Sequence, residues 1–201
     1  MKFLGIKAVI RARKAMYTRV DPETTSQNIL NRNFNATLPN EKWLTDVTEF
    51  KVVGRKQKLY LSAILDLYDK SIVAYEMSLK NDIKLVFNTF DKAISYNPKA
   101  KPIFHSDRGV QYTSKKFQFK LNSQNMIQSM SRAGKCLDNA PMESFWGTLK
   151  SEMYYLNRFY SLNNLKAMLE NYIKFYNYNR FQEKLKCLSP MEYRTQALNY
   201  A

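Results

Sequence analysis

Three acidic residues stand where they could share one site. Asp46 lies in a stretch of alternating apolar and polar residues, Asp107 directly follows the apolar run 103–106, and Glu143 falls early in an amphipathic segment. Three converging carboxylates would form an all-oxygen site, which suits hard divalent cations such as Mg²⁺ or Mn²⁺ rather than zinc. Such sites are typical of phosphoryl transfer, in which two ions about 4 Å apart assist an in-line displacement.

Local context supports this hypothesis better than spacing does. In a chain with 17 acidic residues among 201, pairs at any given separation arise by chance. Asp107, however, precedes Arg108 and Gly109 at the end of an expected strand, and ligands of open α/β sheets bind outside the carboxyl ends of strands. The competing interpretation is that each acid caps a helix or a turn, as strand-end Asp and first-turn Glu residues often do.

The elements that must position these acids follow from the periodicity of apolar residues. Strands are expected at residues 43–51, 58–66, 71–77, 103–106 and 126–130. The first three strands suit an antiparallel meander. Helices are expected between the later strands, behind Asp82 and Ser114, and this β-α-β-α-β order implies a parallel portion of sheet.

A helix expected at residues 139–154 carries two neighbouring stripes. Its apolar stripe consists of Met142, Phe145, Trp146, Leu149 and Met153. The stripe about a quarter turn away consists of Asn139, Glu143, Gly147 and Lys150. One face therefore packs while the next offers an acid and a base. Two more helices are expected behind Ser161 and Ser189, the latter with Glu192 in a capping box.

Composition and charge narrow the function classes. The 201 residues are 45% hydrophobic and 24% charged, which indicates a folded globular chain, and the net charge of +15 favours a polyanionic partner, nucleic acid before an acidic membrane surface. No apolar run is long enough to span a membrane. Cys136 and Cys187 lie far apart without metal-site spacing, so we expect reduced thiols and a cytoplasmic location.

The chain is expected to divide into three parts. Residues 1–20 carry six basic side chains and no acid and read as a basic helical stub, residues 21–40 as a polar linker, and residues 41–201 as the core with its C-terminal helices. The apolar side of the stub has no partner helix before it, so we expect that a preceding segment is missing.

Three ordered motifs and a tail resemble the second-frame protein of insertion-sequence transposases of the IS-three family, relatives of retroviral integrases. The motifs are residues 43–48 (WLTDVT), 105–114 (HSDRGVQYTS) and 131–150 (SRAGKCLDNAPMESFWGTLK), and the tail holds 176–180 (YNYNR) and 188–194 (LSPMEYR). The resemblance extends from about residue 28 to the C-terminus. Residues 4–13 resemble only the end of the helix-turn-helix-like region that precedes the core in this family.

The resemblance implies a ribonuclease-H-like α/β fold, a mixed five-stranded sheet flanked by helices with a C-terminal helical extension. It implies that Asp46, Asp107 and Glu143 are the catalytic acidic triad and bind Mg²⁺ or Mn²⁺, with two ions. The family nicks DNA at the element's end to free a 3′-hydroxyl and joins that hydroxyl to another strand. The implied partners are DNA, further copies of the chain in a homo-oligomer and an upstream-frame protein or frameshift fusion partner. The implied location is the bacterial nucleoid.

Four further residues are candidate DNA contacts. Lys150 would lie beside the scissile phosphate, although a solvated surface lysine is as common. Arg132 and Lys135 flank Gly134 in a loop expected to grip phosphate. Asn139 is a candidate contact too; its position also suits a helix cap or a residue that orients Glu143, and the cap fits better.

The single histidine and a group of aromatic residues allow two interpretations each. His105 shares a strand face with Asp107, so it either supports the site or is a satisfied structural residue. The aromatic residues Tyr172, Phe175, Tyr176 and Tyr178 either stack on bases or pack in the core, and their helical spacing favours the core.

Three functions remain open at this point. The first is a metal-dependent DNA strand transferase of the DDE type. The second is a truncated, non-catalytic DNA-binding fragment that inhibits full-length transposase. The third is a ribonuclease-H-like hydrolase that never joins strands.

Overall fold

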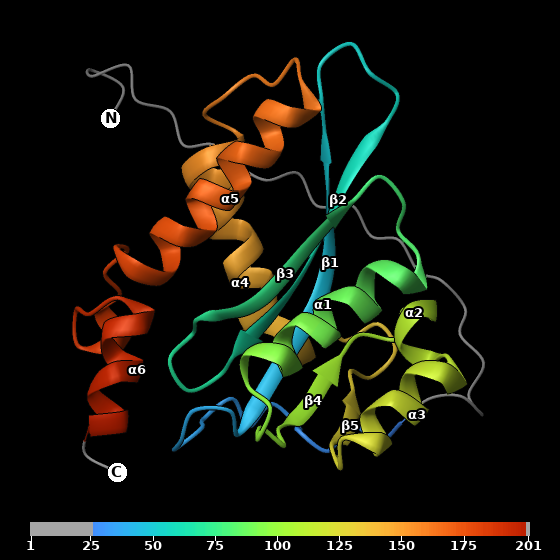
Figure 1. Ribbon diagram of the computed structural model, residues 1–201, viewed down its shortest axis with the longest axis vertical. Helices are drawn as coiled ribbons and strands as arrows, with labels where there is room; N and C mark the ends of the chain where they lie inside the picture. Colours follow the sequence, from blue (N-terminus) through green and yellow to red (C-terminus); the bar gives the residue numbers. More distant parts are fainter. Residues whose placement is uncertain (1–25, 200–201) are drawn as a thin grey trace.

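The computed structural model describes residues 26–199, in which a five-stranded sheet is covered by helices on both faces (Figure 1). The elements are β1 (Lys42–Lys51), β2 (Lys58–Asp66), β3 (Ile72–Ser78), α1 (Ile83–Tyr96), β4 (Ile103–Ser106), α2 (Val110–Thr113), α3 (Lys115–Ser123), β5 (Ile127–Met130), η3 (Cys136–Asn139), α4 (Ala140–Leu149), η4 (Lys150–Tyr154), α5 (Leu162–Tyr178), η5 (Glu183–Leu185) and α6 (Pro190–Asn199). Within the described residues, no helix is long and apolar enough to cross a membrane.

The strand order is β3-β2-β1-β4-β5. β1 pairs antiparallel with β2, and β2 with β3, while β4 runs parallel to both β1 and β5. The expected meander and the expected parallel portion are both confirmed. β1 is the central strand, so the strand that carries Asp46 is hydrogen-bonded on both sides.

Two apolar cores lie on the two faces of the sheet because successive side chains of a strand point in opposite directions. Trp43 of β1 belongs to the core with Phe90 of α1 and Phe117 of α3. Its neighbour Leu44 belongs to the other core, with Trp146 of α4 and the buried face of α5. Figure 1 shows α1 in front of the sheet and α4 behind it.

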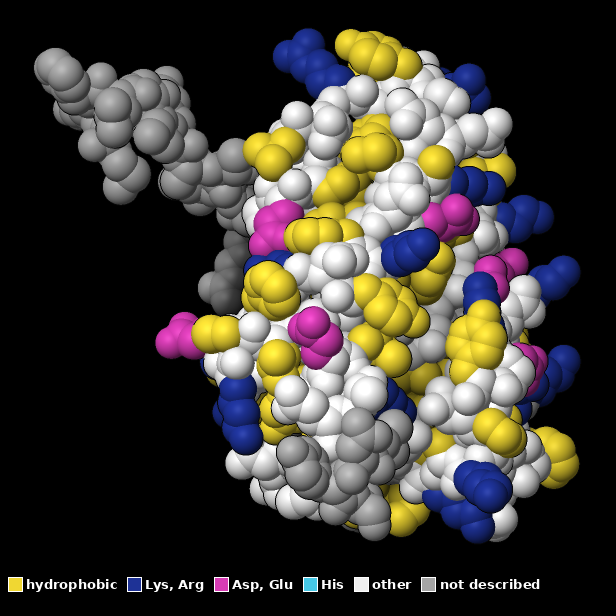
Figure 2. Space-filling view, turned by 60° about the vertical axis from the view of Figure 1, so that its left-hand side comes forward, with side chains coloured by type: hydrophobic (Ala, Val, Ile, Leu, Met, Phe, Trp, Pro, Cys, Tyr) yellow, Lys and Arg dark blue, Asp and Glu magenta, His cyan; other side chains and the backbone are white. Residues whose placement is uncertain are grey.

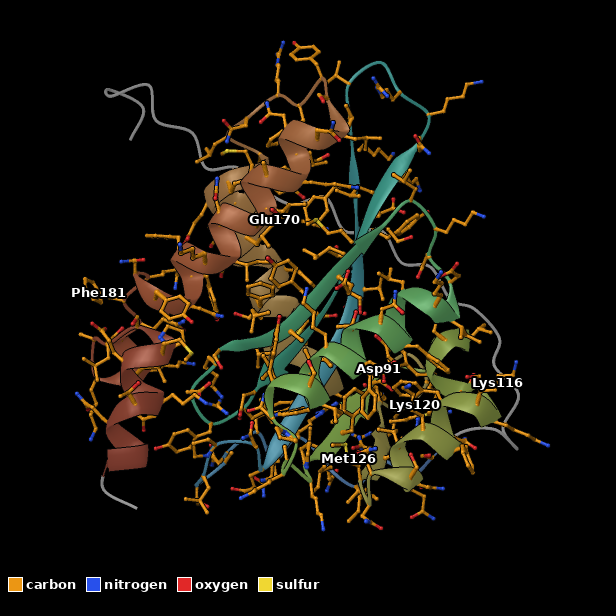
Figure 3. All side chains as sticks on the ribbon, viewed as in Figure 1. Asp91, Lys116, Lys120, Met126, Glu170 and Phe181 are labelled. Atoms are coloured by element: carbon orange, nitrogen blue, oxygen red, sulfur yellow. The ribbon has the colours of Figure 1, made fainter. Side chains whose placement is uncertain are left out.

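The helices of the first core are also joined by charge. Lys120 of α3 forms a 2.6 Å ion pair with Asp91 of α1 (Figure 3) and lies 5.3 Å from the centre of the Phe87 ring. Both side chains are partly exposed, so this pair adds little stability.

Helix starts follow the expected local signals. The Asp82 carboxylate accepts a hydrogen bond from the Leu85 N–H at 3.0 Å at the start of α1. At α6, the Ser189 N–H and hydroxyl both donate to Glu192 at 2.8 Å, which confirms the capping box.

The end of the α4 segment corrects one expectation. A regular helix was expected through residue 154, but α4 ends at Leu149 and a π-helical turn follows, in which the Tyr155 N–H donates to the Lys150 carbonyl at 2.8 Å. Side chains of this turn bond to β1, Lys150 to Thr48 at 2.6 Å and Tyr154 to the Lys51 carbonyl at 2.8 Å. The wider turn thus coincides with contacts to the sheet that no helical periodicity encodes.

Residues 26–30, which begin the described part of the expected linker, pack along β5. Leu30 is 2% exposed, and the N–H groups of Ile29 and Leu30 both donate to the Ser129 hydroxyl at 3.0 Å. The Met130 N–H donates to the Gln27 carbonyl at 3.2 Å. The expected stub at 1–20 lies outside the described residues, and the division at residues 20 and 40 stays a prediction.

A buried ion cluster attaches α6 to the turn between β2 and β3. The Arg194 guanidinium donates to Asp66 at 3.0 Å and to Asp69 at 2.7 Å, and both carboxylates are fully buried. Its other terminal nitrogen donates to the Asn40 amide oxygen at 2.7 Å. The three segments around residues 40, 66 and 194 therefore depend on one cation.

We expect Arg194→Ala to lower the free energy of unfolding by about 3 kcal/mol, because it leaves two buried carboxylates without their cation. Urea denaturation at pH 7 measures this change. The matched control is Arg180→Ala, whose partner Glu152 is 37% exposed, and which should cost less than about 1 kcal/mol. Equal losses in the two variants would show that the cluster is not the anchor of α6.

Candidate active site

Asp46 and Asp107 are brought together by two neighbouring parallel strands. The pairing of β1 with β4 extends to Leu44 and His105. Asp46 and Asp107 stand two residues further along the chain from these partners, and side chains two apart point to the same face. Because neighbouring strands are about 4.8 Å apart, the two carboxylates lie side by side where β4 ends.

Each oxygen of Asp46 has a defined donor. The Val47 N–H donates to Oδ1 at 2.8 Å, and the indole Nε1–H of Trp146 donates to Oδ2 at 3.0 Å. Trp146 is a positioning residue that the sequence analysis missed, because it counted only as part of an apolar stripe. The available signal was chemical, since a buried indole N–H needs an acceptor.

Asp107 is held by its own turn. Its Oδ1 accepts the Gly109 N–H at 2.8 Å, and a Cβ at position 109 would lie 3.0 Å from that oxygen and 2.9 Å from Gln111 Oε1. A glycine is therefore what lets the backbone approach the carboxylate this closely. The Arg108 side chain points elsewhere, with Nε donating to the Ser131 carbonyl at 2.8 Å.

The site is electrostatically strained. Burial, followed by the negative charges of Asp107 and then Glu143, raises the pKa of Asp46 to about 7, despite the hydrogen bonds from Val47 and Trp146. Burial also raises the pKa of Asp107. Among residues 26–199, no arginine forms an ion pair with any of these three acids. The site thus brings acidic groups together without the arginine pairs that neutralise buried carboxylates elsewhere in the fold.

Glu143 is supplied by α4, which contacts β1. It lies in the first turn of α4 and is half-buried. The same helix carries Trp146, whose indole N–H donates to Asp46. The negative charge of Glu143 raises the pKa of the Asp46 carboxyl. α4 therefore brings the third acid into electrostatic range of the β1–β4 pair.

The fit to a metal ion is one of donor type and charge. Within residues 26–199, no three acidic, histidine or cysteine side chains stand close enough together to form a ready metal cage. The three carboxylates nevertheless offer only oxygen donors, the ligands that Mg²⁺ and Mn²⁺ prefer. Burial and the charges of neighbouring acids raise the pKa of Asp46, and a bound cation would oppose both effects.

Lys150 lies beside the acidic pair. Its Nζ donates to Thr48 Oγ1 at 2.6 Å and stands 5.3 Å from the centre of the Phe50 ring. Thr48 is two residues from Asp46 on the same strand face. Lys150 is half-buried, and its bonding partner Thr48 is the next residue after Asp46 on that face of β1.

The loop that leads into α4 is fixed by a carboxylate that the sequence analysis did not single out. Asp138 is fully buried and accepts three hydrogen bonds from Arg132, one from Arg32 and one from Asn28, at 2.7 to 3.0 Å. The hydrogen bonds from Arg132 are the first cause that holds the pKa of Asp138 well below its usual range. Arg132 thus has a structural partner, although its side chain is 45% exposed, whereas Lys135 is simply exposed.

Asn139 faces inward. It is 5% exposed and occupies the N-cap position of α4, but its side chain forms no capping hydrogen bond; its Nδ2 donates weakly to the Thr45 carbonyl at 3.4 Å instead. The geometry ties the start of α4 to β1, and it gives no support to Asn139 as a surface DNA contact.

His105 is structural. Its Nδ1 and Nε2 lie 2.9 Å and 3.1 Å from the hydroxyls of Ser129 and Ser131, and the ring is fully buried. Burial lowers its pKa to about 4, so the ring is neutral at pH 7. Its network joins β4 to the end of β5 and does not include the acids.

The aromatic residues of α5 divide between the two interpretations. Tyr172 and Tyr176 are 7% and 4% exposed and belong to the core. Phe175 and Tyr178 are 45% and 55% exposed. The core interpretation, which helical spacing favoured for the whole set, is therefore confirmed for two of the four residues.

Comparison with known proteins gives one family. Two models of the integrase core domain match, at residues 36–136 and 143–198. Between them they include all three acids of the site.

Individual relatives and structures agree with these models. The putative transposase InsK for insertion sequence element IS150 of Escherichia coli (strain K12) is 45% identical over 197 residues, which cover 98% of this chain and 69% of InsK. The transposase InsF for insertion sequence IS3fB of the same organism is 34% identical over 86% of this chain and 60% of InsF. The HTLV-2 integrase catalytic core domain, solved in complex with magnesium, matches with a TM-score of 0.63 over 80% of this chain and 99% of that one, at 20% identity. This likeness confirms the ribonuclease-H-like fold.

We expect Asp46→Asn to stabilise the metal-free protein at neutral pH. The folded-state pKa of Asp46 is about 7, above the ordinary value near 3.9. Ionisation therefore disfavours the folded state, and the wild type loses stability as the pH rises from about 4 to 7. Asparagine cannot ionise, so the variant should gain about 1–2 kcal/mol over the wild type at pH 8 and little at pH 4.

Urea denaturation in EDTA at both pH values measures this gain. Asp91→Asn, which removes an exposed carboxylate from α1, is the control. Indistinguishable stability of Asp46→Asn and the wild type at pH 8 would mean that burial and the neighbouring charges do not raise the pKa of Asp46.

Asp138→Asn should show the opposite pH dependence. A depressed folded-state pKa stabilises the protein above the ordinary carboxyl pKa and this benefit is lost as the pH falls below about 4. We expect a loss of about 1–2 kcal/mol at pH 7, discounted because both arginines are partly exposed, and a smaller loss at pH 3. Urea denaturation at the two pH values measures the loss. The control is Glu49→Gln, which removes the carboxylate of the exposed pair with Lys58. A loss of stability that grows on acidification would contradict the prediction.

Proposed function

The chain belongs to the family of insertion-sequence transposases with an integrase core, and we propose that it cleaves DNA strands and joins them in a metal-dependent transposition reaction. The observation that carries the proposal is the pair Asp46 and Asp107, side by side at the end of β4 with no arginine partner among residues 26–199 and with the charge of Glu143 acting on Asp46. The similar proteins named above are two transposases and an integrase catalytic core.

In this proposal Asp46, Asp107 and Glu143 hold Mg²⁺ or Mn²⁺, with two ions in the complete site. When bound, such ions activate an attacking water or 3′-hydroxyl and stabilise the leaving oxygen of the phosphodiester. No covalent enzyme intermediate is required. The solved HTLV-2 core contains magnesium, which is consistent with this assignment.

The other residues of the site orient these acids. Trp146 fixes one oxygen of Asp46, and the Gly109 N–H fixes one oxygen of Asp107. Each carboxylate thus keeps its orientation before substrate arrives, which lowers the reorganisation needed during reaction. Lys150, beside Thr48, is suited to bind the phosphate next to the one attacked.

DNA is the proposed substrate, as element ends and as target. The net charge of +15 supports binding of a polyanion. The proposed phosphate contacts are Lys150, Arg132 and Lys135. Arg132 would use the part of its guanidinium group that stays exposed beside Asp138. Action as a homo-oligomer, an upstream-frame or fusion partner and a nucleoid location remain predictions.

The test is a branched DNA that mimics the joined product, incubated with the full chain and Mg²⁺ or Mn²⁺. We expect metal-dependent resolution of the branch. Glu143→Gln should lower the rate at least 100-fold, because it removes one of the proposed metal-binding carboxylates. Glu170→Gln, on the distant helix α5 (Figure 3), is the matched control and should retain the rate.

Three outcomes would overturn the proposal. Equal activity of Glu143→Gln and the wild type would remove Glu143 from the site. A folded wild type that binds the branch without resolving it would favour the non-catalytic, inhibitory fragment. Cleavage of an RNA–DNA hybrid without any strand joining would favour a hydrolase.

A further inference from the structure

The tip of the β1–β2 hairpin and the loop after η4 lie side by side at the upper end of the molecule in Figure 1. The Val53 N–H donates to the Phe159 carbonyl across them at 2.8 Å. We call residues 50–58 and 153–160 together the hairpin platform. No role described above uses this surface.

The platform is a packed unit rather than two separate loops. The Tyr154 hydroxyl donates to the Lys51 carbonyl at 2.8 Å and accepts the Lys51 N–H at 3.0 Å. The Tyr154 ring stacks on Phe159 with centres 5.8 Å apart and meets the edge of Phe50 at 5.0 Å. The exposed side chains of the platform are therefore attached to a fixed, packed backbone.

The platform is strongly basic. Its basic residues are Lys51, Arg55, Lys56, Lys58 and Arg158, and it contains no acidic residue. Lys58 pairs with Glu49 at 2.7 Å. In the part of the chain that the structure describes, the other four form no ion pair, and all four are exposed. These charges are available to an anion from outside.

Exposed apolar and aromatic side chains stand among the charges. Tyr155 and Tyr160 are 42% and 63% exposed, and Val53 and Leu156 are 53% and 66% exposed. Figure 2 shows Lys, Arg and hydrophobic side chains together at the upper end of the molecule. A basic surface with flat rings is what binds a nucleic-acid backbone and stacks on its unpaired bases.

The platform continues directly from the candidate active site. β1 runs five residues past Asp46 to Lys51, a distance of about 17 Å, whereas β4 ends beside the acids. Lys150, bonded to Thr48, stands between the two ends of this path. A DNA strand with its reactive phosphate at Asp46 reaches the platform about five nucleotides away, at roughly 3.4 Å per nucleotide.

We propose that the hairpin platform is a second DNA-binding surface, which grips the backbone of the DNA flanking the reactive phosphate and stacks unpaired bases on Tyr155 and Tyr160. The charges of Arg55, Lys56 and Arg158 bind phosphates, and the rings take bases at a frayed end or a branch. This inference rests on the proposed function for the position of the reactive phosphate. Its test uses binding without metal, so it does not depend on catalysis.

The experiment measures equilibrium binding of the full chain to the branched DNA in EDTA at several salt concentrations. The triple variant Arg55→Ala, Lys56→Ala, Arg158→Ala should bind about 10- to 100-fold more weakly at 0.1 M salt, and the slope of log K against log [salt] should fall by about 2–3. The matched control removes the same charge at Lys99, Lys101 and Lys116, exposed residues around β4 and on α3 (Figure 3). The control should change both quantities much less.

Two further readouts locate the contact. Hydroxyl-radical footprinting of the wild type should protect the backbone about five to eight nucleotides from the branch point, and the triple variant should lose that protection alone. Tyr160→Ala should weaken binding about five-fold or more for DNA with an unpaired end and little for blunt duplex.

Equal weakening by the triple variant and its control would overturn the platform and leave only general charge attraction. Unchanged DNA binding by the triple variant would overturn it too. Loss of the footprint in the triple variant, together with an inactive wild type in the branch assay, would uphold the platform and reject the strand-transfer function.

Discussion

The burial of Asp46 and Asp107 side by side is the constraint around which the structure is built. Parallel pairing of β1 with β4 brings the two carboxylates together, and their burial raises the pKa of both. Holding such a pair costs stability, and the fold offsets that cost with a rigid support. β1 is paired with β2 from Trp43 to Lys51 and packed on both faces, so Asp46 lies in the most constrained part of the sheet.

The chain treats its other buried acids differently. Asp66 and Asp69 share Arg194, and Asp138 is enclosed by Arg32 and Arg132. With 32 basic residues available, neutralising the acids of β1 and β4 would be easy. None of the arginine ion pairs in residues 26–199 does so. The contrast is what a site reserved for a cation from solution requires, and it separates structural acids from candidate catalytic ones.

The sequence was most informative where local rules decide the structure. Alternation predicted all five strands, and the register of β1 with β4 turned two distant acids into neighbours. Capping chemistry predicted the starts of α1 and α6. The contacts that escaped prediction join residues about 100 apart, such as Trp146 with Asp46 and Arg32 with Asp138. No periodicity encodes such pairs, because each partner alone reads as a core tryptophan or a surface arginine.

The same long-range contacts connect the segment before β1 to the acid on α4. Residues 26–34 lie along β5 through the Ser129 hydroxyl and reach Asp138 through Asn28 and Arg32. Asp138 in turn fixes the loop that delivers Glu143, only five residues later. A shift of this segment would therefore withdraw two donors from a buried carboxylate and loosen the start of α4, while Asp46 and Asp107 stay fixed in the sheet. Glu143 is thus the member of the three whose placement depends on chain outside the sheet, and the segment before β1 is part of the structure that sets it.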